Sequence, residues 1–404
     1  MFKPVGSRVN LPEMEGGILN FWRENDTFKK SIELRQDAPL FVFYEGPPTA
    51  NGKPGIHHVL ARVFKDVVLR YRTMRGYHVP RKGGWDTHGL PVELEVEKEL
   101  GISSKSQIEQ FGVAEFNKRC RESVFRYVKD WERLTERIAF WVDMENAYVT
   151  YRNEYIESCW WIIKQLWDKG YVYQDYKVTP HCPRCGTSLS DHEVALGYRD
   201  DAEDPSIYIK FKVEGEPAWL ESTEVPTYLL AWTTTPWTLP GNAAVAVATW
   251  AEYSLVEVER EPGKVEHIVL AKARVESAIK DPHRILKTFH GSELVGTKYQ
   301  PLYDMVPVRS FGDKEVPVYR VVGAEFVALN EGTGIVHTAP AYGEVDLELG
   351  RAEDLPVIHM VDLAGNMTPE PEVSWRGNRL PSVQTAKELL APFAGKFIKA
   401  ADPL

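Results

Sequence analysis

Residues 44–58 read YEGPPTANGKPGIHH, and residues 84–91 read GWDTHGLP. An apolar run, Leu40 to Tyr44, leads into the first stretch, and apolar residues at four-residue spacing follow it from Val59 to Met74. This order predicts a strand, a Gly/Pro-rich turn and an amphipathic helix. The first turn of such a helix offers free N–H groups and a positive dipole end, which suit a phosphate. The stretch therefore predicts a nucleotide site in an α/β fold.

The bulk composition narrows the class of protein. With 404 residues, the chain is long enough for two or three domains. Its 43% hydrophobic and 26% charged residues are ordinary for a globular protein, and no apolar run reaches the length of a membrane span. Four cysteines are too few for a disulfide scaffold, and the N-terminus lacks the apolar core of a signal peptide. We therefore expect a cytoplasmic protein with no membrane partner.

The charge distribution leaves two interpretations open. A formal net charge of −10 argues against a protein that coats nucleic acid. Near the candidate nucleotide site, however, basic residues form a run interrupted by one acid, Asp66. The members are Arg62, Lys65, Arg70, Arg72, Arg75, Arg81 and Lys82. This run is either a solvated helix face or a surface that faces phosphates.

The periodicity changes near residue 200. Before it, further helices are predicted at 93–100, 113–140 and 155–169, with Gly170 as a C-cap. From residue 207 to about 319 the pattern consists of short β-rich runs separated by Gly, Pro and acidic turns. The predicted fold class is thus α/β, with a β-rich domain inserted after the first α/β region.

The neighbouring sequence blocks decide how His57 and His58 are interpreted. His57 and His58 can donate to phosphate oxygens during nucleotidyl transfer, although a histidine pair alone is more often part of a surface loop. The PPTANG run at 47–52 and the GWDTHGLP block, in this order, resemble the isoleucyl branch of the class I aminoacyl-tRNA synthetases. The resemblance implies the first part of a Rossmann-like catalytic domain, in which Asn51, Gly55, His57 and His58 bind ATP with its associated Mg²⁺.

The resemblance also implies an amino-acid site. It gives Asp86 the role of pairing with the ammonium group of isoleucine, as a carboxylate in a cleft does. Gly46 and Pro47 provide backbone and shape around that amino acid. The chain differs from the common His-x-Gly-His motif of the family, since it reads Gly55-Ile56-His57-His58. We hypothesise that His57 replaces the missing first histidine in binding ATP, with changed geometry and changed sensitivity to inhibitors of this pocket.

A metal half-site follows at HCPRCG, residues 181–186. Cys182 and Cys185 have the spacing of a tetrahedral zinc knuckle, and a redox pair is the competing interpretation. In the resembled family a second cysteine pair lies after the inserted domain. We therefore expect Zn²⁺ in the complete protein, with only half of its site in this chain.

A second pocket is predicted from two distant blocks, WTTTPWTLPGN at 232–242 and GTGIVHTAPAYGEVD at 332–346. Consecutive threonines are in themselves merely good strand formers. Together, however, the blocks resemble the editing domain of isoleucyl enzymes. The resemblance implies hydrolysis of the ester between valine and tRNA. In this interpretation Thr233, Thr234 and Thr235 position water and the ester, Asp346 holds the ammonium group, and His337 shapes the pocket and contacts the tRNA end or the substrate.

The need for such a second site is energetic. Isoleucine and valine differ by one methylene, which a hydrophobic pocket discriminates by about 1–3 kcal/mol; isoleucyl enzymes are themselves the standard example of this limit. A second site can admit and hydrolyse the smaller product.

Together these blocks predict a domain organisation and a function. We expect residues 1–198 to form the N-terminal part of the catalytic domain with the zinc half-site, and residues 199–404 to form the editing domain. The family's Lys-Met-Ser-Lys-Ser loop does not occur, so we expect a longer enzyme that binds tRNA(Ile), isoleucine and ATP as a monomer. The expected activity is attachment of isoleucine to tRNA through isoleucyl-adenylate, with editing of Val-tRNA. The alternative is that this chain is only an editing hydrolase or a module that binds the tRNA acceptor end.

Overall fold

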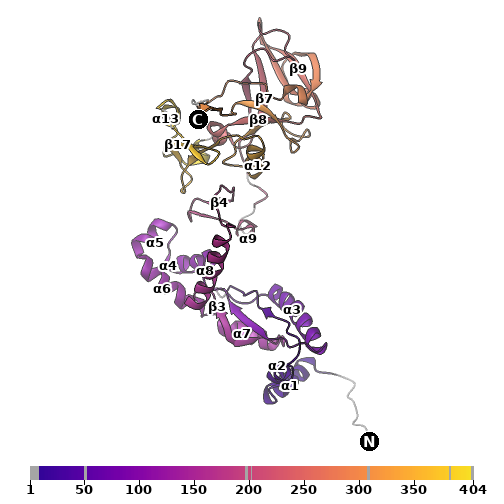
Figure 1. Cartoon of the computed structure of the whole chain (residues 1–404), viewed down its shortest axis with the longest axis vertical. Coiled ribbons are helices and arrows are strands. Elements are labelled where there is room, and N and C mark those ends of the chain that lie inside the picture. Colours follow the sequence, from indigo (N-terminus) through magenta and orange to yellow (C-terminus); the bar gives the residue numbers. More distant parts are fainter. Residues whose placement is uncertain are drawn as a thin grey trace. The chain divides into compact units, whose positions relative to one another are not determined.

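The chain folds into two compact units, Met1–Tyr173 and Gln174–Leu404. The structure is a computed structural model, and it describes residues 9–49, 52–195, 199–201, 203–306, 310–381 and 384–401. Figure 1 labels some of the elements of each unit along the chain. None of the helices within the described residues is long and apolar enough to cross a membrane.

The first unit is mixed α/β, which confirms the predicted class. Its helices are α1 (Leu11–Glu24), α2 (Thr27–Glu33), α3 (Ile56–Met74), α4 (Leu90–Leu100), α5 (Lys105–Phe111), α6 (Val113–Val124), α7 (Val128–Arg137) and α8 (Asn153–Asp168). Its strands β1 (Phe43–Tyr44), β2 (Arg81–Trp85) and β3 (Asp143–Val149) form a parallel sheet in the order β1-β2-β3. The helix predicted over 113–140 is interrupted between α6 and α7, where Phe125 ends α6.

Two small apolar cores hold this unit together. One gathers Trp85, Val92, Val124, Trp131 and Val149, and the other gathers Leu69, Val79, Phe140 and Val142. Burying a side chain of this size contributes about 1.5–3 kcal/mol. Because β1 and β2 run parallel, their carboxyl ends lie at the same edge of the sheet, so the loops after Tyr44 and Trp85 meet there.

Helix α3 does not bury the apolar stripe that its sequence displays. Val67 and Tyr71 are 61% and 53% exposed, whereas Arg62 is only 3% exposed. The guanidinium carbon of Arg62 lies 4.8 Å from the centre of the Trp131 ring, and this cation–π contact offsets part of the cost of burial.

Arg81 is also buried, and it donates to Thr73 Oγ1 at 2.8 Å and to the Trp141 carbonyl at 3.2 Å. Both interpretations of the basic run, a solvated face and a phosphate-facing surface, are therefore wrong for Arg62 and Arg81. These two arginines are internal to the unit.

The second unit is rich in β-structure. Its strands are β4 (His181–Cys182), β5 (Thr187–Ser188), β6 (Ile207–Lys212), β7 (Thr227–Thr233), β8 (Ala244–Val247), β9 (Glu252–Glu261), β10 (Lys264–Ala271), β11 (His283–His290), β12 (Ser310–Phe311), β13 (Lys314–Glu315), β14 (Arg320–Gly323), β15 (Ile335–Thr338), β16 (Val357–Val361), β17 (Met367–Trp375) and β18 (Asn378–Leu380). Its helices are α9 (Asp191–Ala195), η1 (Pro236–Gly241), η2 (Lys272–Arg274), α10 (Val275–Ala278), α11 (Gly291–Leu294), α12 (Glu344–Ala352), α13 (Gln384–Leu390) and α14 (Ile398–Ala401).

One eight-stranded sheet organises this unit. Its order is β11-β9-β10-β7-β15-β8-β14, and β6 pairs with β7. Strand β15 lies between β7, to which it is parallel, and β8, to which it is antiparallel. The chain thus places a late strand between two earlier ones, which brings the block at 332–346 beside the block at 232–242.

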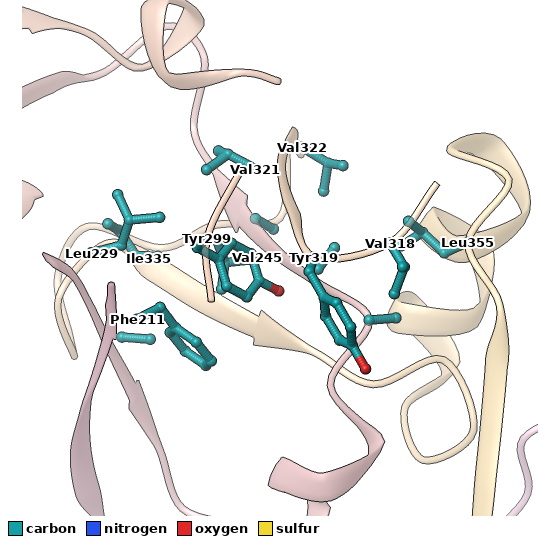
Figure 2. Packing of buried hydrophobic residues seen from close by; sticks show 14 of the residues in the cluster. Phe211, Leu229, Val245, Tyr299, Val318, Tyr319, Val321, Val322, Ile335 and Leu355 are labelled. Atoms are coloured by element: carbon teal, nitrogen blue, oxygen red, sulfur yellow. The ribbon is translucent and has the colours of Figure 1, made fainter. Parts of the chain in front are cut away.

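The core of the second unit lies against this sheet. Leu229 and Val245 are fully buried, and Figure 2 shows them with Phe211, Tyr299 and Ile335 in the same cluster. Truncating a side chain such as Leu229 to alanine in a core of this kind costs about 2–5 kcal/mol.

Candidate functional site

The loops after β1 and β2 meet at the edge of the parallel sheet. The backbone N–H of Asp86 donates to the Pro48 carbonyl at 3.1 Å, and Thr49 Oγ1 donates to Asp86 Oδ2 at 3.1 Å. Thr49 and Asp86 also form an isolated parallel bridge. The structure thereby brings Asp86 next to the loop that contains Gly46 and Pro47, as the sequence predicts.

Contacts from α3 and from β3 hold the backbone around Gly46. Lys65 Nζ, on α3, donates to Glu45 Oε1 at 2.7 Å and to the Gly46 carbonyl at 3.3 Å. The Tyr148 hydroxyl, on β3, donates to the Glu45 carbonyl. Tyr148 can lie there only because Gly84 has no side chain, since a Cβ at that position would stand 2.4 Å from the tyrosine ring. The glycine of the GWDTHGLP block is therefore a packing requirement of this loop.

His57 and His58 begin helix α3, and they have different surroundings. The Gly55 N–H donates to His58 Nδ1 at 2.9 Å, and the His58 ring meets the edge of Trp131 at 4.6 Å. His57 is exposed, and its ring lies close to Gly55. A Cβ atom at position 55 would stand 2.8 Å from Cε1 of His57. Asn51, the remaining residue of the predicted ATP set, lies outside the described residues.

The surroundings of His58 determine its protonation. Burial, His57 and Arg62 lower the pKa of His58, so its ring is neutral near pH 7. Because Nδ1 accepts the Gly55 N–H, the proton of the neutral ring is on Nε2. His58 is thus arranged to donate one hydrogen bond from Nε2.

The segment with Cys182 and Cys185 forms a tight hairpin between β4 and β5. The Gly186 N–H donates to the Cys182 carbonyl at 2.8 Å, and the Cys185 N–H donates to Cys182 Sγ at 3.4 Å. Burial and the nearby Cys182 raise the pKa of the Cys185 thiol. Within the described part of the chain, no group of three or more His, Cys, Asp or Glu side chains could hold a metal ion. A structural zinc site needs four ligands, so zinc binding through these two cysteines stays a prediction.

The second candidate site lies where β7, η1, β8 and β15 meet. Thr233 ends β7 with its side chain buried, Thr234 is exposed, and Thr235 is half-buried. Thr233 Oγ1 accepts from the Thr235 N–H at 3.1 Å and lies 3.2 Å from Thr235 Oγ1. The three threonines are therefore not equivalent, because Thr234 is the one that is exposed.

His337 belongs to the interior of this site. It lies on β15 opposite Val245 and is 6% exposed. Its Nε2 lies 2.8 Å from Thr238 Oγ1, and its Nδ1 lies 2.9 Å from Asn242 Nδ2. Burial lowers the pKa of His337 to about 4, so the ring is neutral at physiological pH.

Asp346 is in the first turn of α12. Its Oδ2 accepts from the Ala339 N–H at 3.4 Å, one residue after the end of β15. Burial raises the pKa of Asp346 to about 6, and this hydrogen bond opposes the rise. Burial destabilises the charged form of such a carboxylate, and a cationic group placed beside it stabilises that charged form strongly.

Sequence reasoning missed two residues of this site, Thr238 and Asn242. Both lie in the block at 232–242 and both contact His337. Thr238 lies within η1, Asn242 is its C-cap, and the two are only 5% and 3% exposed. The signal that could have found them is a polar residue among the apolar ones of this segment, where a buried polar side chain needs an internal partner.

A parallel sheet with a histidine-bearing helix after its first strand, together with the GWDTHGLP block at the sheet edge, defines a class of protein. The chain belongs to the class I tRNA synthetases (I, L, M and V), whose family model matches residues 17–343.

The relatives within this family are isoleucine–tRNA ligases. The chain is 52% identical to the enzyme of Dehalococcoides mccartyi (strain CBDB1), across 100% of the chain and 39% of the relative. It is 46% identical to that of Clostridium novyi, across 100% of the chain and 35% of the relative. It is 49% identical to that of Thermus thermophilus, across 92% of the chain and 34% of the relative. The chain thus spans less than half the length of these relatives.

Among solved structures, the chain is similar to the editing domain of a cytosolic leucyl-tRNA synthetase from P. knowlesi. The identity is 17% and the TM-score is 0.29, across 39% of this chain and 67% of that one. A TM-score this low does not define a common fold.

Proposed function

We propose that this chain serves the ATP-dependent attachment of isoleucine to tRNA(Ile), and that its second unit hydrolyses Val-tRNA(Ile). The identity of 46–52% to isoleucine–tRNA ligases over the whole chain supports the amino acid and the tRNA. The observation that carries the editing role is the convergence of the threonines, His337 and the Asp346 helix at one end of β7 and β15.

In the first unit, the residues that we assign to activation bind and orient. Asp86, fixed by Thr49, pairs with the ammonium group of isoleucine, and Gly46 and Pro47 border the amino acid. Gly55, His57 and His58 lie at the N-terminus of α3, where the helix dipole favours the phosphates of ATP. His58 donates from Nε2 to a phosphate oxygen as charge shifts during adenylate formation. Mg²⁺ arrives with the nucleotide.

In the second unit, we assign hydrolysis of the aminoacyl ester. Asp346 binds the ammonium group of the valyl moiety. The exposed hydroxyl of Thr234 orients water or the ester carbonyl, with Thr233 and Thr235 behind it. Water adds to the carbonyl carbon, the ester C–O bond breaks, and the ribose oxygen leaves with a proton. The products are valine and tRNA(Ile).

The experiment compares Val-tRNA(Ile) hydrolysis by the 404-residue chain and by its Asp346→Ala variant. We expect hydrolysis by the parent chain and a loss of at least about 100-fold in the variant, because the ammonium group is no longer held. The matched control is Glu344→Ala in the same turn of α12, which is exposed and should hydrolyse Val-tRNA(Ile) normally. If the folded Asp346→Ala variant and the parent chain hydrolysed Val-tRNA(Ile) at equal rates, the proposed substrate pocket at Asp346 would be wrong.

The alternative function is an editing hydrolase or a module that binds the tRNA acceptor end, without adenylation. The chain spans 39% of the length of its first relative. Isoleucine-dependent pyrophosphate exchange separates the two functions. Exchange by the 404-residue chain supports activation of isoleucine, whereas Val-tRNA(Ile) hydrolysis without exchange supports the alternative.

We further propose that Cys182 and Cys185 supply half of a zinc site whose role is structural. The hairpin geometry and the Cys185 N–H···Cys182 Sγ bond are what a zinc knuckle uses to orient thiolates. We propose a cytoplasmic monomer, which fits four unpaired cysteines and the composition of the chain.

A further inference from the structure

A directed series of hydrogen bonds runs from Tyr299 to the buried end of the candidate editing site. Tyr299 donates from its hydroxyl to Asn242 Oδ1 at 2.7 Å. Tyr299 is 1% exposed, and Figure 2 shows it between Phe211 and Tyr319, whose rings lie 4.9 and 6.2 Å from its own. Burial keeps the pKa of Tyr299 well above its ordinary value, so the hydroxyl is always a donor.

The orientation of the Asn242 amide follows from its partners. Its nitrogen Nδ2 lies 2.8 Å from the Ala244 carbonyl, which can only accept a hydrogen bond. The flipped amide would place Oδ1 against that carbonyl, so that two acceptors would face each other. The Ala244 carbonyl therefore selects the orientation in which Nδ2 points its second hydrogen at His337, and the Tyr299 hydroxyl, by donating to Oδ1, stabilises this same orientation.

This orientation fixes the tautomer of His337. Since Asn242 Nδ2 donates across 2.9 Å to His337 Nδ1, that nitrogen is an acceptor and the proton of the neutral ring is on Nε2. His337 Nε2 then donates to Thr238 Oγ1 at 2.8 Å, and the Thr238 hydroxyl donates in turn to the Thr235 carbonyl at 2.8 Å. Both ring nitrogens are engaged inside the protein. The ring has no lone pair left for a water or a substrate.

We propose that Asn242, oriented by Tyr299 and the Ala244 carbonyl, holds His337 as the neutral Nε2–H tautomer, so that His337 is a positioning residue and not a base. Through Thr238 it fixes the turn that carries Thr234 and Thr235. This narrows the role expected from sequence, in which His337 also touched the tRNA end or the substrate. The part that concerns hydrolysis rests on the proposed editing function.

The first test is the tautomer itself, in the 404-residue chain. Long-range ¹H–¹⁵N spectra of histidine-labelled chain distinguish protonated from unprotonated ring nitrogens, and the His337 signals are assigned by their loss in His337→Gln. We expect Nε2 protonated and Nδ1 unprotonated from pH 8 to pH 5. A charged ring or an Nδ1–H tautomer in this range overturns the proposal. Because the measured chain carries no substitution at the site, the result does not depend on the folding of a variant.

The second test changes the donor that faces Nδ1. In Asn242→Asp the carboxylate can only accept, so we expect the His337 proton to move to Nδ1 or the ring to become charged. Tyr253→Phe is the matched control, because Tyr253 is a buried tyrosine of the same core whose hydroxyl bonds the Ala248 N–H and the Gly334 carbonyl. We expect it to leave the tautomer unchanged. A folded Asn242→Asp chain that keeps the Nε2–H tautomer contradicts the proposal.

The third test links the tautomer to hydrolysis. We expect Asn242→Asp to lower kcat for Val-tRNA(Ile) about 100-fold with little change in KM, because the threonines are displaced while Asp346 still binds the ammonium group. Tyr299→Phe should lower kcat by a smaller factor and Tyr253→Phe should not lower it. An unchanged kcat in a folded Asn242→Asp chain overturns the positioning role. If the parent chain hydrolyses no Val-tRNA(Ile), the proposed function fails while the tautomer result stands by itself.

Discussion

At the scale of single residues, Asp346 combines a functional assignment with a cost in stability. Its pKa is about 6 in the folded chain, against about 3.9 for an exposed aspartate. The folded state therefore binds more protons between pH 4 and 6, and the free energy of unfolding decreases as the pH rises through this window. At pH 7 the buried carboxylate of Asp346 is ionised, so the decrease in the free energy of unfolding is complete.

We therefore expect Asp346→Asn to be more stable than the parent chain at pH 7, by up to about 2 kcal/mol, and to lose this advantage below pH 4. Urea unfolding at both pH values measures this difference. Glu344→Gln is the control, since its side chain is exposed in the same turn and its replacement should be neutral. An Asp346→Asn chain that is destabilised at pH 7 would show that the carboxylate is held by partners that favour its charge.

The same carboxyl gives the hydrolysis a pH dependence. Protonation of Asp346 below pH 6 removes the charge that binds the ammonium group, so KM for Val-tRNA(Ile) should rise as the pH falls from 7 to 5. His337, with a pKa of about 4, adds no step in this range. The measurement is the pH profile of KM and kcat. A KM that is constant down to pH 5 contradicts the assignment of Asp346.

His337 contributes to stability with the opposite sign. Its pKa falls from about 6.5 in an unfolded chain to about 4 in the folded one, so the folded state binds fewer protons between these values. Stability is lost as the pH falls from 6.5 to 4, which opposes the gain from Asp346. We expect Asp346→Asn to show a steeper loss of stability than the parent chain over this interval in urea titrations. Parallel curves would indicate that Asp346 does not titrate with a raised pKa in the folded chain, and a variant curve that stays flat over this interval would indicate that His337 is not buried as a neutral ring.

At the scale of elements, the start of α3 shows what His58 does within Gly55-Ile56-His57-His58. His58 is at the third helical position and accepts the N–H of the N-cap Gly55, the task that an acidic residue performs in a capping box. The retained histidine therefore stabilises the helix start. The moved histidine, His57, is exposed beside it.

Gly55→Ala tests this arrangement. The new Cβ would stand 2.8 Å from the exposed His57 ring, which can rotate away, so stability should change by less than about 0.5 kcal/mol. In a full-length enzyme with this sequence, KM for ATP in pyrophosphate exchange should rise because His57 has been displaced. Gly52→Ala is the control, since a Cβ there meets nothing within 4 Å. Equal KM values for the two variants would exclude His57 from the ATP site.

Sequence patterns predicted most elements of this fold. The short β-rich runs expected from residue 207 onward begin with β6 to β10. Periodicity failed at α3, where Arg62 is buried against Trp131 while valines are exposed, because aromatic contacts outweigh the apolar pattern there. The role of Tyr299 had no signal in the sequence. It depends on the pairing of strands that are far apart in the chain.

At the scale of the whole molecule, each unit has its own apolar core, so each can lose its structure in its own transition. Gly84→Ala would place a Cβ 2.4 Å from the Tyr148 ring in the first unit, and Gly291→Ala would place one 2.2 Å from the Ala248 carbonyl in the second. We expect each variant to lower one unfolding transition by about 1–3 kcal/mol and to leave the other unchanged. Tryptophan fluorescence in a urea titration follows both. A single transition lowered by both variants would contradict two independent units.

The central claim is that the second unit hydrolyses Val-tRNA(Ile) and recognises the valyl group by its small size and its ammonium group. The most direct measurement is the ratio of kcat/KM for Val-tRNA(Ile) and Ile-tRNA(Ile) hydrolysis by the 404-residue chain. We predict a ratio well above about 10, because a pocket that admits valine excludes the extra methylene of isoleucine. Equal hydrolysis of the two esters, or hydrolysis of neither by a folded chain, would contradict the claim.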